Sequence, residues 1–398
     1  MKKNEKGLPF LAAVEVGEEL YYSTWLKNGL FKMNQLTRKI TYIGRVWEEQ
    51  RETNLHKFAF HYKNYIYFIP SYAQYIAKLC LDSLSISVLN IPVPEKSRPL
   101  SKFSDIVSIG NTLWLIPYAY GAILKVDLET DQIAEFDNWP SEILDSGNCV
   151  PLFRGGVHTS NNLCICPYEG KDFVTFDLEK HDMKSWRWKF PAHAFCKMIL
   201  HENVIWFLPE NDYPYIIGYD LGTDEEIRIK TNDQIGNDIV AMYSDAIVVG
   251  DYIVVLPCQS DHWMLLNVKS KEIVRRKVTN VERFKGKEYP RYQAANYFSE
   301  GFIATKDIDE SGVYFANDSF NPEAIQFIMD DEILCDYMWD IMFHSGISKE
   351  RNQSLIEDTD GSFDTYLRLL CEHRGQKDNK GWKGKNFGSE IYQKVRQQ

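Results

Sequence analysis

Two histidines are candidates for acid–base chemistry. His262 lies between Asp261 and Trp263, and His158 closely follows a pair of glycines. Histidine is the side chain whose charge changes near neutral pH, so His262 or His158, assisted by Glu210, could serve a lyase or a hydrolase. The sequence has no nucleophile-elbow, zinc-protease, P-loop or dinucleotide-binding motif. Catalysis on a sugar or a peptide-like substrate is therefore the alternative hypothesis, and these three residues are its candidates.

Aromatic residues with polar neighbours form a second set of candidates, which would bind a ligand instead. They follow apolar strings and share their loops with carboxylates and amides. Aromatic rings offer flat apolar platforms, while the polar groups read hydroxyls or amides. The candidates of this kind are Trp25, Tyr72, Tyr118, Tyr168, Tyr213, Asp261, His262 and Trp263. They predict that the partner is a glycan, a peptide or a protein.

Four charged residues recur at equivalent places ahead of these loops. Asp105, Arg154, Lys197 and Asp245 each lie 12 or 13 residues before a proline that ends an apolar string. Two of the four are acidic and two are basic. We expect the four side chains to converge from different repeats, where they would bind water, one another or a ligand.

A sequence pattern that recurs along the chain predicts the strands that position these residues. An apolar string, a proline, a loop and a second string recur with the prolines at 47, 50, 42 and 48 residue intervals. The same register extends without the proline to Ser23 and Thr305. A strand-bearing period of about 40–50 residues is typical of propeller blades. The sequence predicts an all-β fold, a seven-bladed β-propeller of four-stranded antiparallel blades, over residues 8–330. Two stacked β-sandwiches are the alternative. The aligned prolines are Pro70, Pro117, Pro167, Pro209 and Pro257.

The strands within a repeat differ in polarity. The second is apolar on both faces, as in residues 113–116 and 204–208, which is typical of a strand buried between neighbouring blades. The last is polar, as in residues 226–230, which suits an outer edge. In a propeller, the loop between the second and third strands lies on the face where the innermost strand begins. Both candidate sets are thus predicted to surround the mouth of the central channel.

The blades resemble those of bacterial repeat propellers related loosely to the kelch, WD40 and streptogramin-lyase-like groups. The resemblance rests on the apolar strand, the proline, the loop and the Asp-Leu string that ends the third strand, as at Asp127-Leu128 and Asp177-Leu178. The paired glycines of kelch repeats and the Gly-His and Trp-Asp pairs of WD40 repeats are missing. The catalytic histidine pattern of the lyase-like group is not matched either. The resemblance therefore implies a fold and assigns no residue a role.

Composition limits the classes of partner. The net charge is −11 and the pI about 5.4, which argues against general binding to nucleic acid or to an anionic membrane surface. The sequence has no apolar span long enough for a membrane helix. The eight cysteines are scattered, and Cys164 and Cys166 lack a companion pair at metal-ligand spacing. We expect buried, reduced cysteines in a cytoplasmic protein that needs no metal and no cofactor.

The repeat ends near Met329. Residues 331–398 are predicted to form a small helical extension, because apolar residues recur at helical spacing from Glu332 and Ser362 could cap a further helix. A basic loop, residues 374–388, interrupts it. The sequence as a whole favours a non-enzymatic binding or scaffolding propeller.

Overall fold

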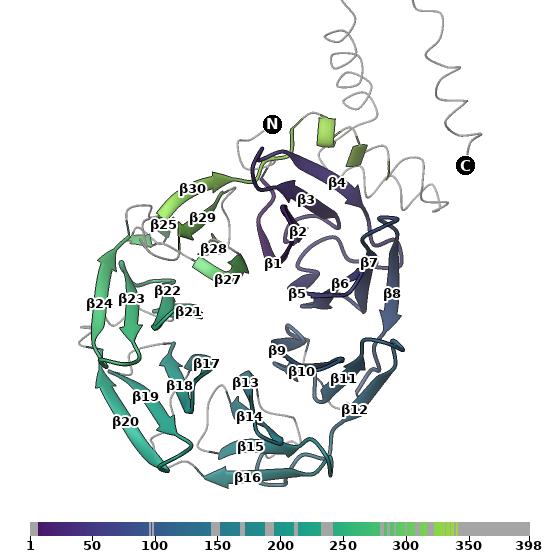
Figure 1. The fold of residues 1–398 in the computed structure, drawn as a ribbon. Helices are drawn as coiled ribbons and strands as arrows, with labels where there is room; N and C mark the ends of the chain where they lie inside the picture. The colour runs from purple at the N-terminus through teal and green to yellow at the C-terminus, as the bar shows by residue number, and fades with distance from the viewer. Residues whose placement is uncertain are drawn as a thin grey trace, which may run out of the picture.

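The computed structural model describes most of the repeat region and little beyond it. The described residues are 7–94, 97, 99–144, 152–167, 172–187, 195–210, 214–231, 242–278, 282–284, 287–289, 292–298, 301–306, 311–316, 322–330, 332–334, 336, 337 and 340. They form a β-propeller of four-stranded antiparallel blades (Figure 1). No helix within these residues is long and apolar enough to cross a membrane.

Six of the blades lie between β1 and β24, and in each the strands pair in chain order from the innermost outwards. The first three contain β1 (Phe10–Val16), β2 (Glu19–Thr24), β3 (Leu30–Asn34), β4 (Ile40–Gly44), β5 (His56–Tyr62), β6 (Tyr65–Pro70), β7 (Tyr75–Cys80), β8 (Ile86–Asn90), β9 (Phe103–Ile109), β10 (Thr112–Pro117), β11 (Ile123–Asp127) and β12 (Ile133–Phe136). The next three contain β13 (Phe153–Thr159), β14 (Asn162–Pro167), β15 (Asp172–Asp177), β16 (Met183–Arg187), β17 (Phe195–His201), β18 (Val204–Pro209), β19 (Tyr215–Asp220), β20 (Glu225–Lys230), β21 (Tyr243–Val249), β22 (Tyr252–Pro257), β23 (His262–Asn267) and β24 (Ile273–Lys277).

A further four-stranded antiparallel sheet lies between the sixth blade and the first (Figure 1). It contains β27 (Tyr292–Phe298), β28 (Gly301–Lys306), β29 (Ser311–Ala316) and β30 (Pro322–Gln326). Its innermost strand, β27, contacts both β21 and β1. The two-stranded hairpin of β25 (Glu282–Phe284) and β26 (Lys287–Tyr289) precedes it.

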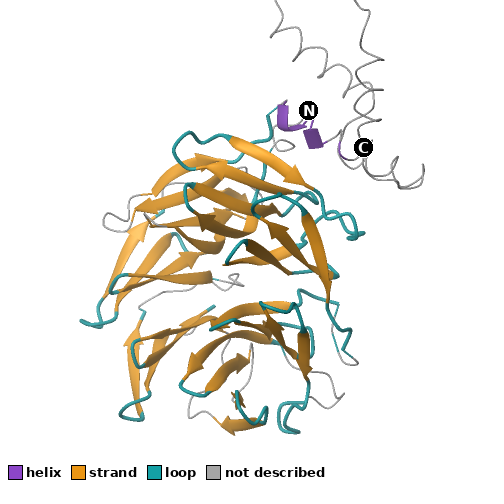
Figure 2. Ribbon diagram, turned by 45° about the vertical axis from the view of Figure 1, so that its right-hand side comes forward, coloured by secondary structure: helices purple, strands orange, loops and turns teal. Residues whose placement is uncertain are grey.

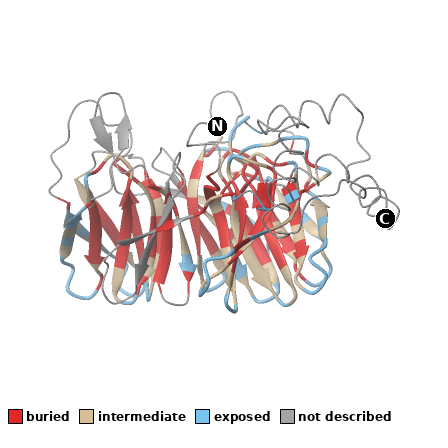
Figure 3. Ribbon diagram, turned by 90° about the horizontal axis from the view of Figure 1, so that it is seen from above, coloured by how far each residue is buried: buried red, intermediate tan, exposed pale blue. Residues whose placement is uncertain are grey.

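The core is a set of interblade layers, because a blade alone cannot bury both faces of its sheet. In β6, β10, β14, β18 and β22, every residue after the first is buried, as the continuous apolar pattern predicts. The outer strands are more exposed, and β20 has no fully buried residue. Figure 3 shows the buried residues within the blades and the exposed ones at the turns.

Every innermost strand is interrupted by a β-bulge just after its first residue, where the register with the second strand shifts. A bulge bends a strand and re-aims the side chains beside it. The residue before the bulge is buried and aromatic in every case. These residues are Phe10, His56, Phe103, Phe153, Phe195, Tyr243 and Tyr292. The paired glycines of β13 fall at this bulge, but the other strands bulge without them.

The ends of the repeat region are joined to each other. The N–H of Leu8 donates to the carbonyl of Phe327 at 2.8 Å, and Gly7 pairs with Ile328. Leu8 is fully buried in a cluster that also contains Ile303 of β28. The chain start therefore holds the last sheet against the first blade.

Part of the predicted C-terminal extension is described and is helical. Residues 332–334, 336, 337 and 340 are helical, and the Asp330 carboxylate accepts the N–H of Ile333 at 2.8 Å, as an N-cap does. Ile333, Leu334 and Tyr337 pack in the same cluster as Phe10 of β1. Figure 2 shows this short helical segment at the edge of the propeller. The basic loop and the other predicted helices lie outside the described residues.

His56 gives the first testable prediction, since it is the one imidazole among the aromatic residues before the bulges. Burial lowers the pKa of His56 from its ordinary 6.5 to about 3, and only its Nδ1 is bonded, to Ser23 Oγ at 2.7 Å. As the pH falls below 6.5, the His56 imidazole therefore becomes protonated in the unfolded chain but stays neutral in the folded chain. Stability should fall as the pH drops from about 6.5 towards 3. In His56→Phe this loss should be smaller, as measured by urea unfolding at about pH 7 and pH 4.5.

The matched control is His61→Phe in the same strand. His61 bonds the carbonyl of Lys63 at 2.6 Å and is not fully buried. This variant should keep the pH dependence of the wild type. If the free energy of unfolding changed equally with pH in the wild type and in His56→Phe, the role given to His56 would be contradicted.

Candidate functional site

The mouth of the channel is built from backbone links between blades. In the first three blades the residue that follows the second strand, Trp25, Ser71 or Tyr118, donates to its own blade and accepts from the next. The N–H of Trp25 donates to the carbonyl of Pro9 at 2.6 Å, and its carbonyl accepts the N–H of Asn54 at 2.7 Å. Tyr118 does the same between Lys102, at 2.7 Å, and Phe153, at 3.1 Å. The backbone of these residues is therefore fixed at the rim whatever side chain they carry.

The aromatic side chains at this rim are half-buried and in contact with cations. The guanidinium of Arg51 lies 4.6 Å from the centroid of the Tyr72 ring, and that of Arg154 lies 5.2 Å from the ring of Tyr118. Such contacts orient a ring without covering it completely. Trp25, like these two tyrosines, keeps part of its side chain exposed. The rings can therefore still meet a ligand.

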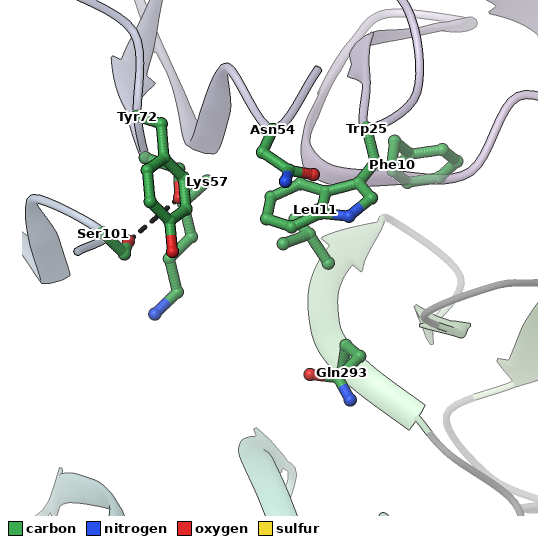
Figure 4. A pocket seen from close by; sticks show the side chains of 9 residues that line it. Phe10, Leu11, Trp25, Asn54, Lys57, Tyr72, Ser101 and Gln293 are labelled. Carbon is green, nitrogen blue, oxygen red and sulfur yellow. Dashed lines mark hydrogen bonds between the residues drawn. The ribbon is translucent and has the colours of Figure 1, made fainter. Parts of the chain in front are cut away.

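A pocket of about 190 Å³ opens between the rings of Trp25 and Tyr72 (Figure 4). Ser71 and Ser101 form one wall of the pocket, and their hydroxyls are joined by a hydrogen bond of 2.9 Å. Hydroxyl, amide and ammonium groups face the same space as the aromatic rings. The lining residues are Phe10, Leu11, Trp25, Asn54, Lys57, Ser71, Tyr72, Ser101 and Gln293.

Deeper in the mouth, one lysine joins three blades. The Lys197 ammonium on β17 lies 3.3 Å from the Asp105 carboxylate on β9 and 3.5 Å from the Asp245 carboxylate on β21. All three side chains are largely buried, with 12 to 18% of their surface exposed. The convergence of these charges that the sequence predicts is thus present, and it is an ion-pair network.

The carboxylates of this network are also bonded to the backbone. Asp105 accepts the N–H of Ile106 at 3.0 Å, and Asp245 accepts those of Ala246 at 2.9 Å and Ala295 at 3.1 Å. Burial raises the pKa of Asp105, and the Lys197 cation opposes that rise. Burial alone would lower the pKa of Lys197, but the two carboxylates outweigh it and raise that pKa above its ordinary value.

A second ion pair crosses the mouth beside the first. The guanidinium of Arg154 lies 2.7 Å from the Glu210 carboxylate of the next blade. Arg154 is the bulged residue of β13, and the following Gly155 leaves room for the network: a Cβ there would lie 3.2 Å from an Asp105 oxygen. Gly155 also has a φ of +142°, which side chains rarely adopt. A side chain at this position would thus strain the backbone and crowd Asp105.

Sequence reasoning missed Lys57, which lies in the same mouth. Lys57 is the bulged residue of β5 and stands 13 residues before Pro70, the offset that Arg154 has from Pro167. Applying that offset to the second repeat would have found it. The half-buried ammonium lines the pocket with Trp25 and Tyr72.

The remaining sequence candidates do not join this group. Trp263 was expected at the rim but is only 3% exposed, because it packs against the rings of Tyr292 and Phe302 between two blades. His158 lies at the far end of β13 from the mouth and bonds the carbonyl of Ser160 at 2.8 Å. For Trp263 this corrects the predicted rim position, because side chains alternate along β23 and its ring turns into the layer between blades. The chain direction of β13 puts His158 at the end away from the mouth. Tyr168 and Tyr213 lie outside the described residues.

His262 forms a pair with Asp261 at the start of a third strand, farther out on the same face. Among the described residues, neither side chain bonds to Glu210, which pairs with Arg154 instead. The three candidates for catalysis, His262, His158 and Glu210, thus lie in three different places. No cluster of three or more histidine, cysteine or carboxylate side chains within the described residues is arranged to hold a metal ion.

Comparisons with known proteins agree with this architecture. No family model matches the chain, and no curated protein matches its sequence. Solved structures do match. Streptogramin B lyase superposes with a TM-score of 0.57 and 11% identity over 77% of this chain and 93% of the other. The shared feature is the β-propeller.

Two further structures show the same likeness. YCF48 from Cyanidioschyzon merolae gives a TM-score of 0.53 and 8% identity over 81% of this chain and 95% of its own. PorZ, a surface component of the type-IX secretion system of Porphyromonas gingivalis, gives a TM-score of 0.54 and 9% identity over 80% of this chain. The chain spans 38% of PorZ. At these identities the likeness concerns the fold alone.

The Lys197 network yields a stability prediction. Lys197→Met would leave the Asp105 and Asp245 carboxylates close together in a largely buried site without their cation. The free energy of unfolding at neutral pH should fall by roughly 3 kcal/mol, measured by urea denaturation. The deficit should shrink as the pH falls, because protonating one carboxylate relieves the repulsion.

The control for this prediction is Lys277→Met on the exposed outer strand β24. It should change the free energy of unfolding by less than about 0.5 kcal/mol. A Lys197→Met protein as stable as this control would show that the network does not hold the blades.

Proposed function

We propose that the chain is a seven-bladed propeller that binds a glycan, peptide or protein ligand at the mouth of its channel, without catalysing a reaction. The sheet of β27 to β30 is then the seventh blade. Support for this count comes from the contacts of β27 with β21 and β1 and from the bond between Leu8 and Phe327. A closed ring leaves one mouth on each face, and the site described above surrounds one of them.

The observation that carries the proposal is the pocket between two half-buried aromatic rings whose backbones are already fixed. A ring that is held before the ligand arrives loses little conformational freedom on binding. Trp25 and Tyr72 offer apolar faces, while Asn54 and Gln293 offer amides beside them. This combination suits a ligand that has both apolar faces and hydroxyl or amide groups.

The charges of the mouth favour binding over catalysis. Lys197, Asp105 and Asp245 satisfy one another, and Arg154 is paired with Glu210. A general acid or base must reach the reacting group and exchange its proton there. No observation places a histidine within such reach of the pocket, so the lyase or hydrolase alternative lacks a specific observation in its favour.

The proposed partner class and compartment rest on simpler observations. The net charge of −11 supports a ligand other than nucleic acid or an anionic membrane. The five described cysteines are free thiols, which fits the proposed cytoplasmic location.

The test is ligand capture by a rim variant. Trp25→Ala combined with Tyr72→Ala removes both aromatic platforms of the pocket. Capture from glycan and peptide arrays should weaken by at least about tenfold, since each stacking contact contributes roughly 1 kcal/mol. The melting temperature should change little, because neither ring is part of the buried core.

The matched control is Trp263→Ala, which removes a buried tryptophan from the core between blades. It should lower the free energy of unfolding by roughly 3–5 kcal/mol and leave capture intact below its melting temperature. Array capture that is the same for wild type and the Trp25 and Tyr72 double variant would exclude this pocket as the binding site.

A further inference from the structure

Lys57 differs from the other described cations of the mouth in the surroundings of its ammonium. Within the described residues, its ammonium makes no hydrogen bond and no ion pair, and its Nζ lies 5.4 Å from the centroid of the Phe58 ring. Lys197 and Arg154 each have a carboxylate within 3.5 Å. A half-buried ammonium without a partner costs free energy, which an anion would recover.

The surroundings of Lys57 select the kind of anion. The side chains of Lys57, Tyr72 and Trp25 extend into one opening, and Gln293 lies across it (Figure 4). Asn54, Ser71 and Ser101 add amide and hydroxyl groups. One cation, two flat rings and several neutral hydrogen-bonding groups match a single sugar ring that carries one acidic group.

The size and the wider charge pattern narrow the choice further. A pocket of about 190 Å³ is smaller than the roughly 300–1,000 Å³ of sites for drug-sized ligands, so one ring fits better than a long segment. Asp105 and Asp245 act on Lys57 electrostatically, together with Arg154 and Lys197. These two carboxylates and two cations balance in number, so Lys57 adds one positive charge, which matches a singly charged carboxylate.

We propose that Lys57 binds the carboxylate of an acidic sugar unit, a uronate, whose ring lies between Trp25 and Tyr72. The inference rests on the proposed binding function and specifies its ligand. Lys57 supplies the charge, the aromatic rings contact the faces of the sugar, and the amides and hydroxyls of the pocket bond its hydroxyl groups.

The protonation of Lys57 agrees with this role. Burial, followed by the Arg154 and Lys197 cations, lowers the pKa of Lys57 to about 8, while Asp245 and Asp105 oppose that change. The ammonium is therefore mostly charged below pH 8 in the free protein. Uronate affinity should be highest there and should weaken by at least about tenfold between pH 6.5 and pH 9.5.

The experiment is isothermal titration of the full chain with D-glucuronate at about pH 6.5. Lys57→Met should weaken binding by about tenfold or more, because a charge-assisted hydrogen bond is lost. Lys57→Arg, which keeps the charge, should stay within about threefold of the wild type. D-glucose, which lacks the carboxylate, should bind the wild type about as weakly as D-glucuronate binds Lys57→Met.

Two controls separate this result from damage to the fold. Lys39→Met removes an exposed lysine from the turn between β3 and β4, on the opposite face, and should leave the affinity unchanged. Lys57→Met should melt at the same temperature as the wild type or higher, since it removes an unpaired charge. Wild-type affinity in Lys57→Met would overturn the inference.

Other outcomes distinguish the ligand from the function. Equal affinity for D-glucose and D-glucuronate would overturn the role of Lys57 and leave a sugar-binding pocket in place. Lys57-dependent binding of a short peptide through its terminal carboxylate, tighter than that of D-glucuronate, would overturn the sugar assignment. Array capture that depends on Trp25 and Tyr72 but not on Lys57 would overturn this inference and support the proposed function.

Discussion

The backbone hydrogen bonds between neighbouring blades are the constraint on which the site depends. At the three junctions where both bonds fall within the described residues, the residue after a second strand bonds both its own blade and the next, as Trp25 does between Pro9 and Asn54. These bonds need no particular side chain, so the sequence is free to vary there. The fold therefore holds a rim at which side chains can change while their positions do not. Rings and charges at this rim are preorganised without strain elsewhere in the blade.

The bulges of the innermost strands complete this arrangement. Each buries an aromatic ring just before the bulge and turns the following residues towards the mouth. In three blades these residues carry the charges of the Lys197 network, and their mutual pairing lets them stay ionised in a largely buried place. Lys57 is the bulged residue itself, one place before that position, and no carboxylate among the described residues pairs with it. The difference between a paired and an unpaired cation separates the structural part of the mouth from the part that we propose binds a ligand.

Much of the fold could be predicted from sequence because its signals are local. The prolines end second strands, and Asp127, at the end of a third strand, bonds the N–H groups of Glu129 and Thr130 as a hairpin turn requires. The site was harder to predict from the sequence. A periodic pattern shows the repeat, but it does not show on which face of the sheet, or at which end of its strand, each residue lies. Trp263 alternates into the core, and His158 lies at the opposite end of its strand. The partners of each charge depend on which blades are neighbours across the mouth, and no local pattern contains that information.

The most direct measurement of the central claim is hydrogen exchange, followed by mass spectrometry, with and without D-glucuronate. The account predicts slower exchange in segments 24–28, 54–58 and 71–75, which line the mouth beside the first two blades. The turns at 34–39, 127–132 and 177–182, on the opposite face, should exchange as before. Protection of those turns, with no change around Trp25, Lys57 and Tyr72, would contradict it.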